Sequence, residues 1–110
     1  MGKAITWTIE DEVVALHLAL HGVRGLDYDA DQMEDIIANT LFPKKGFRMR
    51  VQNYRYIVTK GKEGLDAGYP QGFPLYRNLT RIFSSMDASD FTEYVNLILS
   101  RRDRMATTET

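Results

Sequence analysis

The chain contains no cysteine, which excludes disulfide bonds, thiolate metal sites and a cysteine nucleophile. A cysteine-free chain also suits the reducing conditions of the cytoplasm, where we expect this protein to reside. Long apolar runs are missing as well, because no stretch approaches the roughly 18 consecutive apolar residues that a transmembrane helix needs. The first twelve residues hold no apolar run with a small-residue cleavage site, so we expect neither a secretory signal nor membrane association.

Motifs for catalysis are also absent. The chain has no Gly-x-Ser-x-Gly, no phosphate-binding glycine loop ending in Lys-Ser/Thr and no HNH-type nuclease motif. His17 and His21 share a helical face, but the residues between them lack the glutamate of zinc proteases, so we expect two partly exposed histidines. Asp27, Asp29 and Asp31 alternate as in a calcium loop that here lacks its glycine and its bidentate glutamate. We therefore expect no enzymatic activity, no metal and no cofactor.

Charge is unevenly distributed along the chain, although the net charge is only −1. Residues 1–42 carry eight acidic and two basic residues, a net of −6. Residues 43–62 carry seven basic residues and no acidic one, and residues 63–110 have a net charge of −2. A molecule with this asymmetry can present a basic face to an anion such as DNA, or an acidic face to a basic protein.

Apolar periodicity in the first part of the chain predicts a helix from about residue 9 to His21. Thr8 has the side chain of an N-cap, and acidic residues fill the first turn, where the helix dipole favours them. Gly22 is expected to stop the helix, because glycine adopts the left-handed conformation without steric cost. The core-facing positions should be Ile9, Val13, Leu16 and Leu20, widened by Val14 and Leu18.

Two further helices are expected before residue 60. Asp29 or Asp31 should cap a second helix that runs to about Leu41. The third helix, at about 44–58, could open at Pro43, whose missing N–H is not needed at the first helical position. It could also start at Gly46, because glycine costs about 1 kcal/mol inside a helix.

The second half of the chain predicts a loop and two more helices. Glycine and proline recur in residues 61–74, but apolar residues also recur there, so we expect an ordered loop. Helices should follow at about 75–83 and, capped by Asp87 or Ser89, to about residue 100. The expected fold is all-α, one domain with a leader (1–5), a three-helix core of the helix-turn-helix type (6–60), an ordered Gly/Pro-rich loop (61–74), two C-terminal helices (75–100) and a tail (101–110).

The basic segment 43–62 is the candidate binding site. At helical spacing Phe47, Val51, Tyr54 and Val58 form an apolar stripe, so one side of the helix should be buried. A separate stripe of cations and an amide would then face water. The side chains on or beside that stripe are Lys44, Arg48, Gln52 and Arg55.

A helix with this face suits the major groove of DNA. Arg48 and Arg55 could bind guanine, and Gln52 and Asn53 could bind adenine. Tyr56 could pack on a sugar or donate to a phosphate. The lysines would hold phosphates and set the register, and they are Lys44, Lys45, Lys60 and Lys62. Two alternatives remain open: a solvated basic helix without a ligand, and an Asn53 that bonds to the preceding loop or marks the end of the helix.

The order of these features resembles a Myb/SANT-type helix-turn-helix. The segments 7–12, 47–54 and 64–65 and a helix at about 75–83 are also similar to the helical module N-terminal to HNH nucleases in bacterial restriction-type proteins. The resemblance covers roughly residues 6 to 85 and implies DNA binding by the third helix through Arg48, Gln52, Asn53 and Arg55. Two features depart from these families: Trp7 is the only tryptophan where Myb repeats have three, and the nuclease is absent.

Two functions are therefore predicted from different classes. The first is a double-stranded DNA-binding module, a recognition or regulatory component of a restriction, defence or phage system, with a homodimer matching paired half-sites. The alternative is a SANT-like protein–protein interaction module or small regulator that does not bind DNA. The near-zero net charge and the acidic first two helices favour the alternative.

Overall fold

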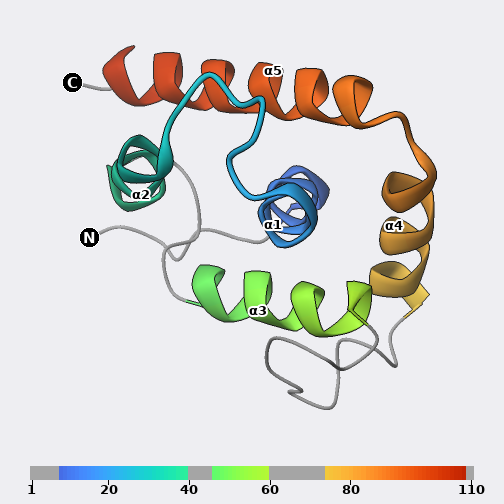
Figure 1. Ribbon diagram of the computed structural model, residues 1–110. Helices are drawn as coiled ribbons and strands as arrows, with labels where there is room; N and C mark the ends of the chain where they lie inside the picture. Colours follow the sequence, from blue (N-terminus) through green and yellow to red (C-terminus); the bar gives the residue numbers. More distant parts are fainter. Residues whose placement is uncertain (1–7, 40–45, 60–73, 109–110) are drawn as a thin grey trace.

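Five α-helices make up the part of the chain that the computed structural model describes, residues 8–39, 46–59 and 74–108 (Figure 1). No strand occurs within these ranges, so the all-α prediction is confirmed. None of the described helices is long and apolar enough to cross a membrane. The helices are α1 (Ile9–His21), α2 (Ala30–Asn39), α3 (Phe47–Val58), α4 (Pro74–Ser85) and α5 (Ala88–Thr108).

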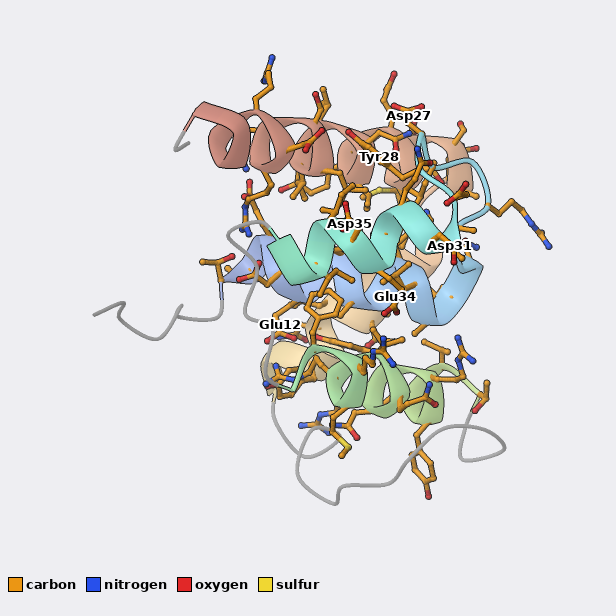
Figure 2. The ribbon with its side chains drawn as sticks, turned by 90° about the vertical axis from the view of Figure 1, so that its left-hand side faces the viewer. Glu12, Asp27, Tyr28, Asp31, Glu34 and Asp35 are labelled. Atoms are coloured by element: carbon orange, nitrogen blue, oxygen red, sulfur yellow. The ribbon has the colours of Figure 1, made fainter. Side chains whose placement is uncertain are left out.

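Helix α1 lies at the centre of the molecule. Val13, Val14, Ala15 and Leu16 are all fully buried, and four consecutive residues cover every side of a helix. Such a helix must be surrounded, and α5 and α3 lie on opposite sides of it, with α4 at a third side (Figure 1). Helix α2 lies beside α1, between the levels of α5 and α3 (Figure 2).

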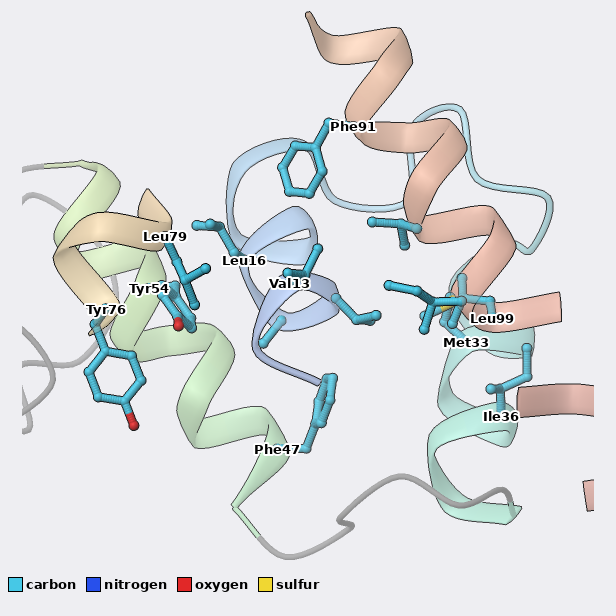
Figure 3. Close-up of a cluster of buried hydrophobic side chains, with 14 residues drawn as sticks. Val13, Leu16, Met33, Ile36, Phe47, Tyr54, Tyr76, Leu79, Phe91 and Leu99 are labelled. Atoms are coloured by element: carbon cyan, nitrogen blue, oxygen red, sulfur yellow. The ribbon is translucent and has the colours of Figure 1, made fainter. Parts of the chain in front are cut away.

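The other four helices direct their apolar side chains at α1 (Figure 3). The stripe predicted for the third helix is buried or half-buried, as expected. Ile9 was expected in the core but is 59% exposed, because it is the first residue of α1 and projects beyond the helices that cover the rest. The buried cluster that includes α1 also contains Met33 and Ile36 from α2, Phe47 and Tyr54 from α3, Leu79 from α4, and Phe91 and Leu99 from α5.

The ends of α1 and α2 follow local capping rules. Thr8 and Asp11 form a reciprocal capping box, and the Gly22 N–H donates to the Leu18 carbonyl, so both predicted ends of α1 are confirmed. Asp29 accepts from the Gln32 N–H at 2.8 Å, while the Gln32 side chain accepts from the Asp29 N–H at 2.9 Å. Asp29 rather than Asp31 is therefore the cap of α2.

Helix α3 begins at Phe47, after Gly46, whose φ of 84° stops any helix from extending across it. Of the two predicted starts of this helix, Pro43 and Gly46, the structure therefore supports Gly46. Helix α5 is capped by Asp87, whose carboxylate accepts from the Ser89 N–H at 2.9 Å. The predicted tail at 101–110 is wrong for 101–108, because α5 continues to Thr108.

Ion pairs with the start of α1 explain the extra length of α5. Arg102, which is buried, lies 3.0 Å from the carboxylate of Asp11, and Arg101 pairs with Glu10. These contacts hold the last turns of α5 against another helix. A C-terminal segment without them would fray.

The connection between α1 and α2 is fastened to α5. The Asn96 amide donates to the Gly25 carbonyl at 3.2 Å and accepts from the Asp27 N–H at 2.9 Å. Gly25 has a φ of 79°, and a Cβ there would lie 3.0 Å from the Thr92 methyl carbon. Glycine is therefore required at this position both for its backbone conformation and for the close approach to α5.

Candidate nucleic-acid interface on α3

Helix α3 presents opposite sides to the core and to solvent. Phe47 and Tyr54 are buried against α1, whereas Arg48 and Met49 are exposed and Gln52 is half-buried. The helix contains no acidic residue in any turn. Its outward side therefore carries the exposed guanidinium of Arg48, the amide of Gln52 and the half-buried phenol of Tyr56.

Arg50 belongs to the core and not to this surface. Its guanidinium forms an ion pair with Glu12 of α1, and the two side chains are only 13% and 5% exposed. Arg50 also donates to the Tyr76 hydroxyl at 2.6 Å, and the Tyr54 hydroxyl donates to Glu12 at 2.8 Å. Burial and the neighbouring Glu12 carboxylate raise the pKa of Tyr54 well above its usual value. The cluster thus satisfies a buried charge pair and joins α1, α3 and α4.

Arg48 lies at the edge of the surface that faces α2. It pairs with Glu34, and the side chains are 82% and 55% exposed (Figure 2). Such an exposed pair contributes about 0–1 kcal/mol to stability, because water screens both charges. The pair therefore leaves Arg48 available to a competing anion.

Gln52 and Arg55 extend the surface along α3. Gln52 and Arg48 form part of the rim of a cavity of about 230 Å³ between α1, α2 and α3. Its apolar walls are Leu18, Ile37, Phe47 and Val51. Arg55 is half-buried and donates to the Leu18 carbonyl at 3.4 Å, near the C-terminal end of α1.

Asn53 is not part of this surface, which corrects the sequence prediction. The residue is only 2% exposed, and in helical projection it lies beside Arg50, on the side of Arg50 away from Tyr54. It cannot reach a base edge in this conformation. Neither of its side-chain amide atoms has a hydrogen-bond partner within the described ranges, so the predicted bond to the preceding loop is not seen there either.

The four lysines predicted to hold phosphates lie outside the described residues. They flank α3 in sequence, two before its start and two after its end. Of the nine predicted contact residues, Arg48, Gln52, Arg55 and Tyr56 are therefore the ones that the structure brings together at the surface. The four outside the described ranges are Lys44, Lys45, Lys60 and Lys62.

Of the two histidines of α1, only His21 matches the expectation of partial exposure. His17 is fully buried and His21 is half-buried. His17 Nδ1 lies 3.1 Å from the Gly22 carbonyl, which can only accept, so Nε2 accepts from the Thr92 hydroxyl at 2.9 Å. Burial, with a smaller effect from the charge of His21, lowers the pKa of His17 to about 4. Within the described ranges, no group of three or more His, Asp or Glu side chains could hold a metal.

A larger cavity of about 790 Å³, on the α5 side of the molecule, was not predicted from the sequence. It lies between the segment 21–27 and α5, and its charged side chains include Arg24, Asp27 and Glu93. The two walls are more than 60 residues apart in the chain, so no local pattern indicates the cavity. Its mixture of charges does not select a ligand class, in contrast to the acid-free helix α3.

Comparisons with models of protein families, with curated proteins and with solved structures found no match for this chain. The function of the surface is therefore inferred from its geometry and charge alone.

Proposed function

We propose that this chain is a double-stranded DNA-binding module whose contact surface is the outward side of α3. The observation that carries the proposal is the arrangement of one acid-free helix. Arg50, whose side chain is only 13% exposed, is neutralised by Glu12, while Arg48, Gln52 and Tyr56 lie on the side away from the core. The guanidinium of Arg48 is thus directed outwards, where a phosphate backbone can approach.

The side chains suit distinct parts of a DNA duplex. Arg48 can bind guanine or a phosphate with two parallel hydrogen bonds, and Gln52 can bind adenine in the same manner. Arg55 and Tyr56 can donate to phosphates on either side. The flanking lysines would add contacts that position α3 without reading sequence.

The proposal includes a helix-turn-helix arrangement of the Myb/SANT type, with α3 as the recognition helix across α1. One recognition helix covers few base pairs, so a homodimer on paired half-sites is part of the proposal. Since the chain carries no recognised catalytic motif, the module would serve as a recognition component of a restriction, defence or phage system.

The test is a fluorescence-anisotropy titration with a random-sequence duplex at roughly 50 and 200 mM salt. Four to six phosphate contacts predict a log–log slope of about −4 to −5, which weakens binding by a factor of several hundred between the two conditions. Arg48→Glu should lower affinity at the lower salt by at least about tenfold. Arg24→Glu is the matched control, because it makes the same charge change at an exposed residue on the α5 side of the molecule.

Two results would contradict DNA binding by α3. One is the absence of binding at the lower salt by protein whose helical circular dichroism shows that it is folded. The other is an equal loss of DNA affinity in Arg48→Glu and Arg24→Glu, since that would show that binding responds to net charge and not to the α3 surface.

A protein-interaction function is the second candidate, and the acidic side of the molecule favours it. Asp27, Asp31, Glu34 and Asp35 are all exposed on α2 or just before it (Figure 2). A basic protein partner would be attracted to this side. This candidate predicts that charge reversal at Arg48 leaves partner binding unchanged, whereas neutralising the α2 carboxylates weakens it in a salt-dependent manner.

A further inference from the structure

Glu34 occupies a position that a DNA-binding surface would ordinarily leave free of negative charge. It lies on the side of α2 that faces α3, whereas the next residue, Asp35, lies on the opposite side (Figure 2). Its carboxylate pairs with Arg48, the most exposed arginine of α3. A phosphate that approached Arg48 would therefore also approach Glu34.

The two ion pairs of α3 differ in whether they can open. Glu12 and Arg50 are nearly inaccessible, so separating them would leave a buried charge without a partner. Glu34 and Arg48 are both mostly exposed, and water solvates either charge once they separate. Arg48 can therefore exchange Glu34 for another anion without disturbing the fold.

We propose that Glu34 is a specificity-determining residue that positions Arg48 and competes with DNA phosphates for it. This inference rests on the proposed DNA-binding function. A phosphate carries a full negative charge and is repelled by Glu34, whereas the guanine edge is neutral and suffers much less repulsion. Glu34 thus weakens sequence-independent binding more than it weakens a base contact, and it keeps Arg48 oriented at the rim of the cavity between α1, α2 and α3.

The first test compares Glu34→Gln with the wild-type chain on the random-sequence duplex used above. Removing the negative charge of Glu34 should raise DNA affinity about threefold to tenfold at low salt. The larger value is expected if Arg48, released from Glu34, forms its own ion pair with a phosphate. The log–log salt slope should become steeper by up to about 0.9, the value for one more neutralised phosphate. Asp35→Asn is the matched control: it removes one negative charge from the neighbouring position on the α5 side of α2, away from α3, and should change affinity less than about twofold.

The second test repeats the Glu34→Gln change in an Arg48→Gln background. If Glu34 acts through Arg48, the gain in affinity should largely disappear in this background. A gain that persists unchanged would overturn the inference, because it would show general repulsion without a role for Arg48. An unchanged affinity of Glu34→Gln, in a chain that does bind DNA, would also overturn it while leaving the proposed function intact. If neither protein binds DNA, the proposed function fails and the inference fails with it.

Discussion

The three arginines of α3 differ in their surroundings despite lying within eight residues of one another. Arg48 is exposed beside Glu34, Arg50 is mostly enclosed beside Glu12, and Arg55 is half-buried and donates to a backbone carbonyl. Helical spacing predicts that Arg48 and Arg50 point in different directions, because two residues correspond to about 200° of rotation. It does not predict which carboxylate each of them meets, since both partners lie on other helices.

His17 makes the stability of the fold dependent on pH. Its pKa falls from 6.5 to about 4 on folding, so the unfolded chain binds a proton more readily than the folded one. The stabilisation from neutral His17 is therefore complete above about pH 6.5 and is lost as the pH falls toward about 4. Between about pH 7 and pH 5 this group should cost the fold about 2 kcal/mol, and urea unfolding at both values measures it.

A histidine variant provides the control for this pH effect. His17→Gln should be less stable at neutral pH, but it should lose much less stability on going to about pH 5 than the wild type does. His21→Gln should keep most of the wild-type loss, because burial is the main cause of the lowered pKa of His17 and the charge of His21 is only a smaller one. Most carboxylates remain ionised in this range, so they contribute little to the difference. Equal losses in wild type and His17→Gln would rule out His17 as the cause.

At the scale of elements, helix starts and helix ends depend on interactions of different range. The start of α1, its stop at Gly22 and the start of α2 depend on residues within a few positions, and sequence patterns identify them. The end of α5 depends on Arg101 and Arg102, which pair with residues about 90 positions earlier. A sequence pattern places cations there to suit the helix dipole, but it does not show that they hold α5 against α1.

Arg101 and Arg102 of α5 should therefore differ in their effect on stability. Arg102→Leu leaves the buried Asp11 carboxylate without its cation and should lower the free energy of unfolding by about 3 kcal/mol. Arg101→Leu removes a half-exposed pair with Glu10 and should cost less than about 1 kcal/mol. Urea denaturation followed by circular dichroism at 222 nm, a routine helix signal, compares the two. Equal effects would mean that the Asp11 contact does not hold the end of α5.

At the scale of the whole molecule, α1 joins the other helices into one cooperative unit. It is the helix against which α3, α4 and α5 all pack, and its middle residues are fully buried. Helices α3 and α4 also contact each other, and Phe83 of α4 packs on Phe91 of α5, but the most extensive helix contact is that of α1 with α3. Loss of packing at α1 should accordingly destabilise the entire fold.

A pair of leucine variants tests this dependence. Leu16→Ala creates a cavity at the centre and should lower the free energy of unfolding by about 2–5 kcal/mol. Leu97→Ala truncates the same residue type where it is 66% exposed and should change stability by less than about 1 kcal/mol. Thermal unfolding of Leu16→Ala should remain a single transition that coincides for helical and aromatic signals. Separate transitions would show that the outer helices fold independently of α1.

The sequence by itself determined the all-α class, the number of described helices and most helix ends. These features follow from hydrogen bonding and apolar periodicity over about four residues, which a single sequence displays directly. It also indicated an outward polar side of α3 with Arg48 and Gln52. Only the tertiary structure decided that Asn53 and His17 are buried and that Glu34 lies beside Arg48. The physical reason is that burial and charge pairing depend on residues brought together from distant parts of the chain, and a local pattern does not identify those partners.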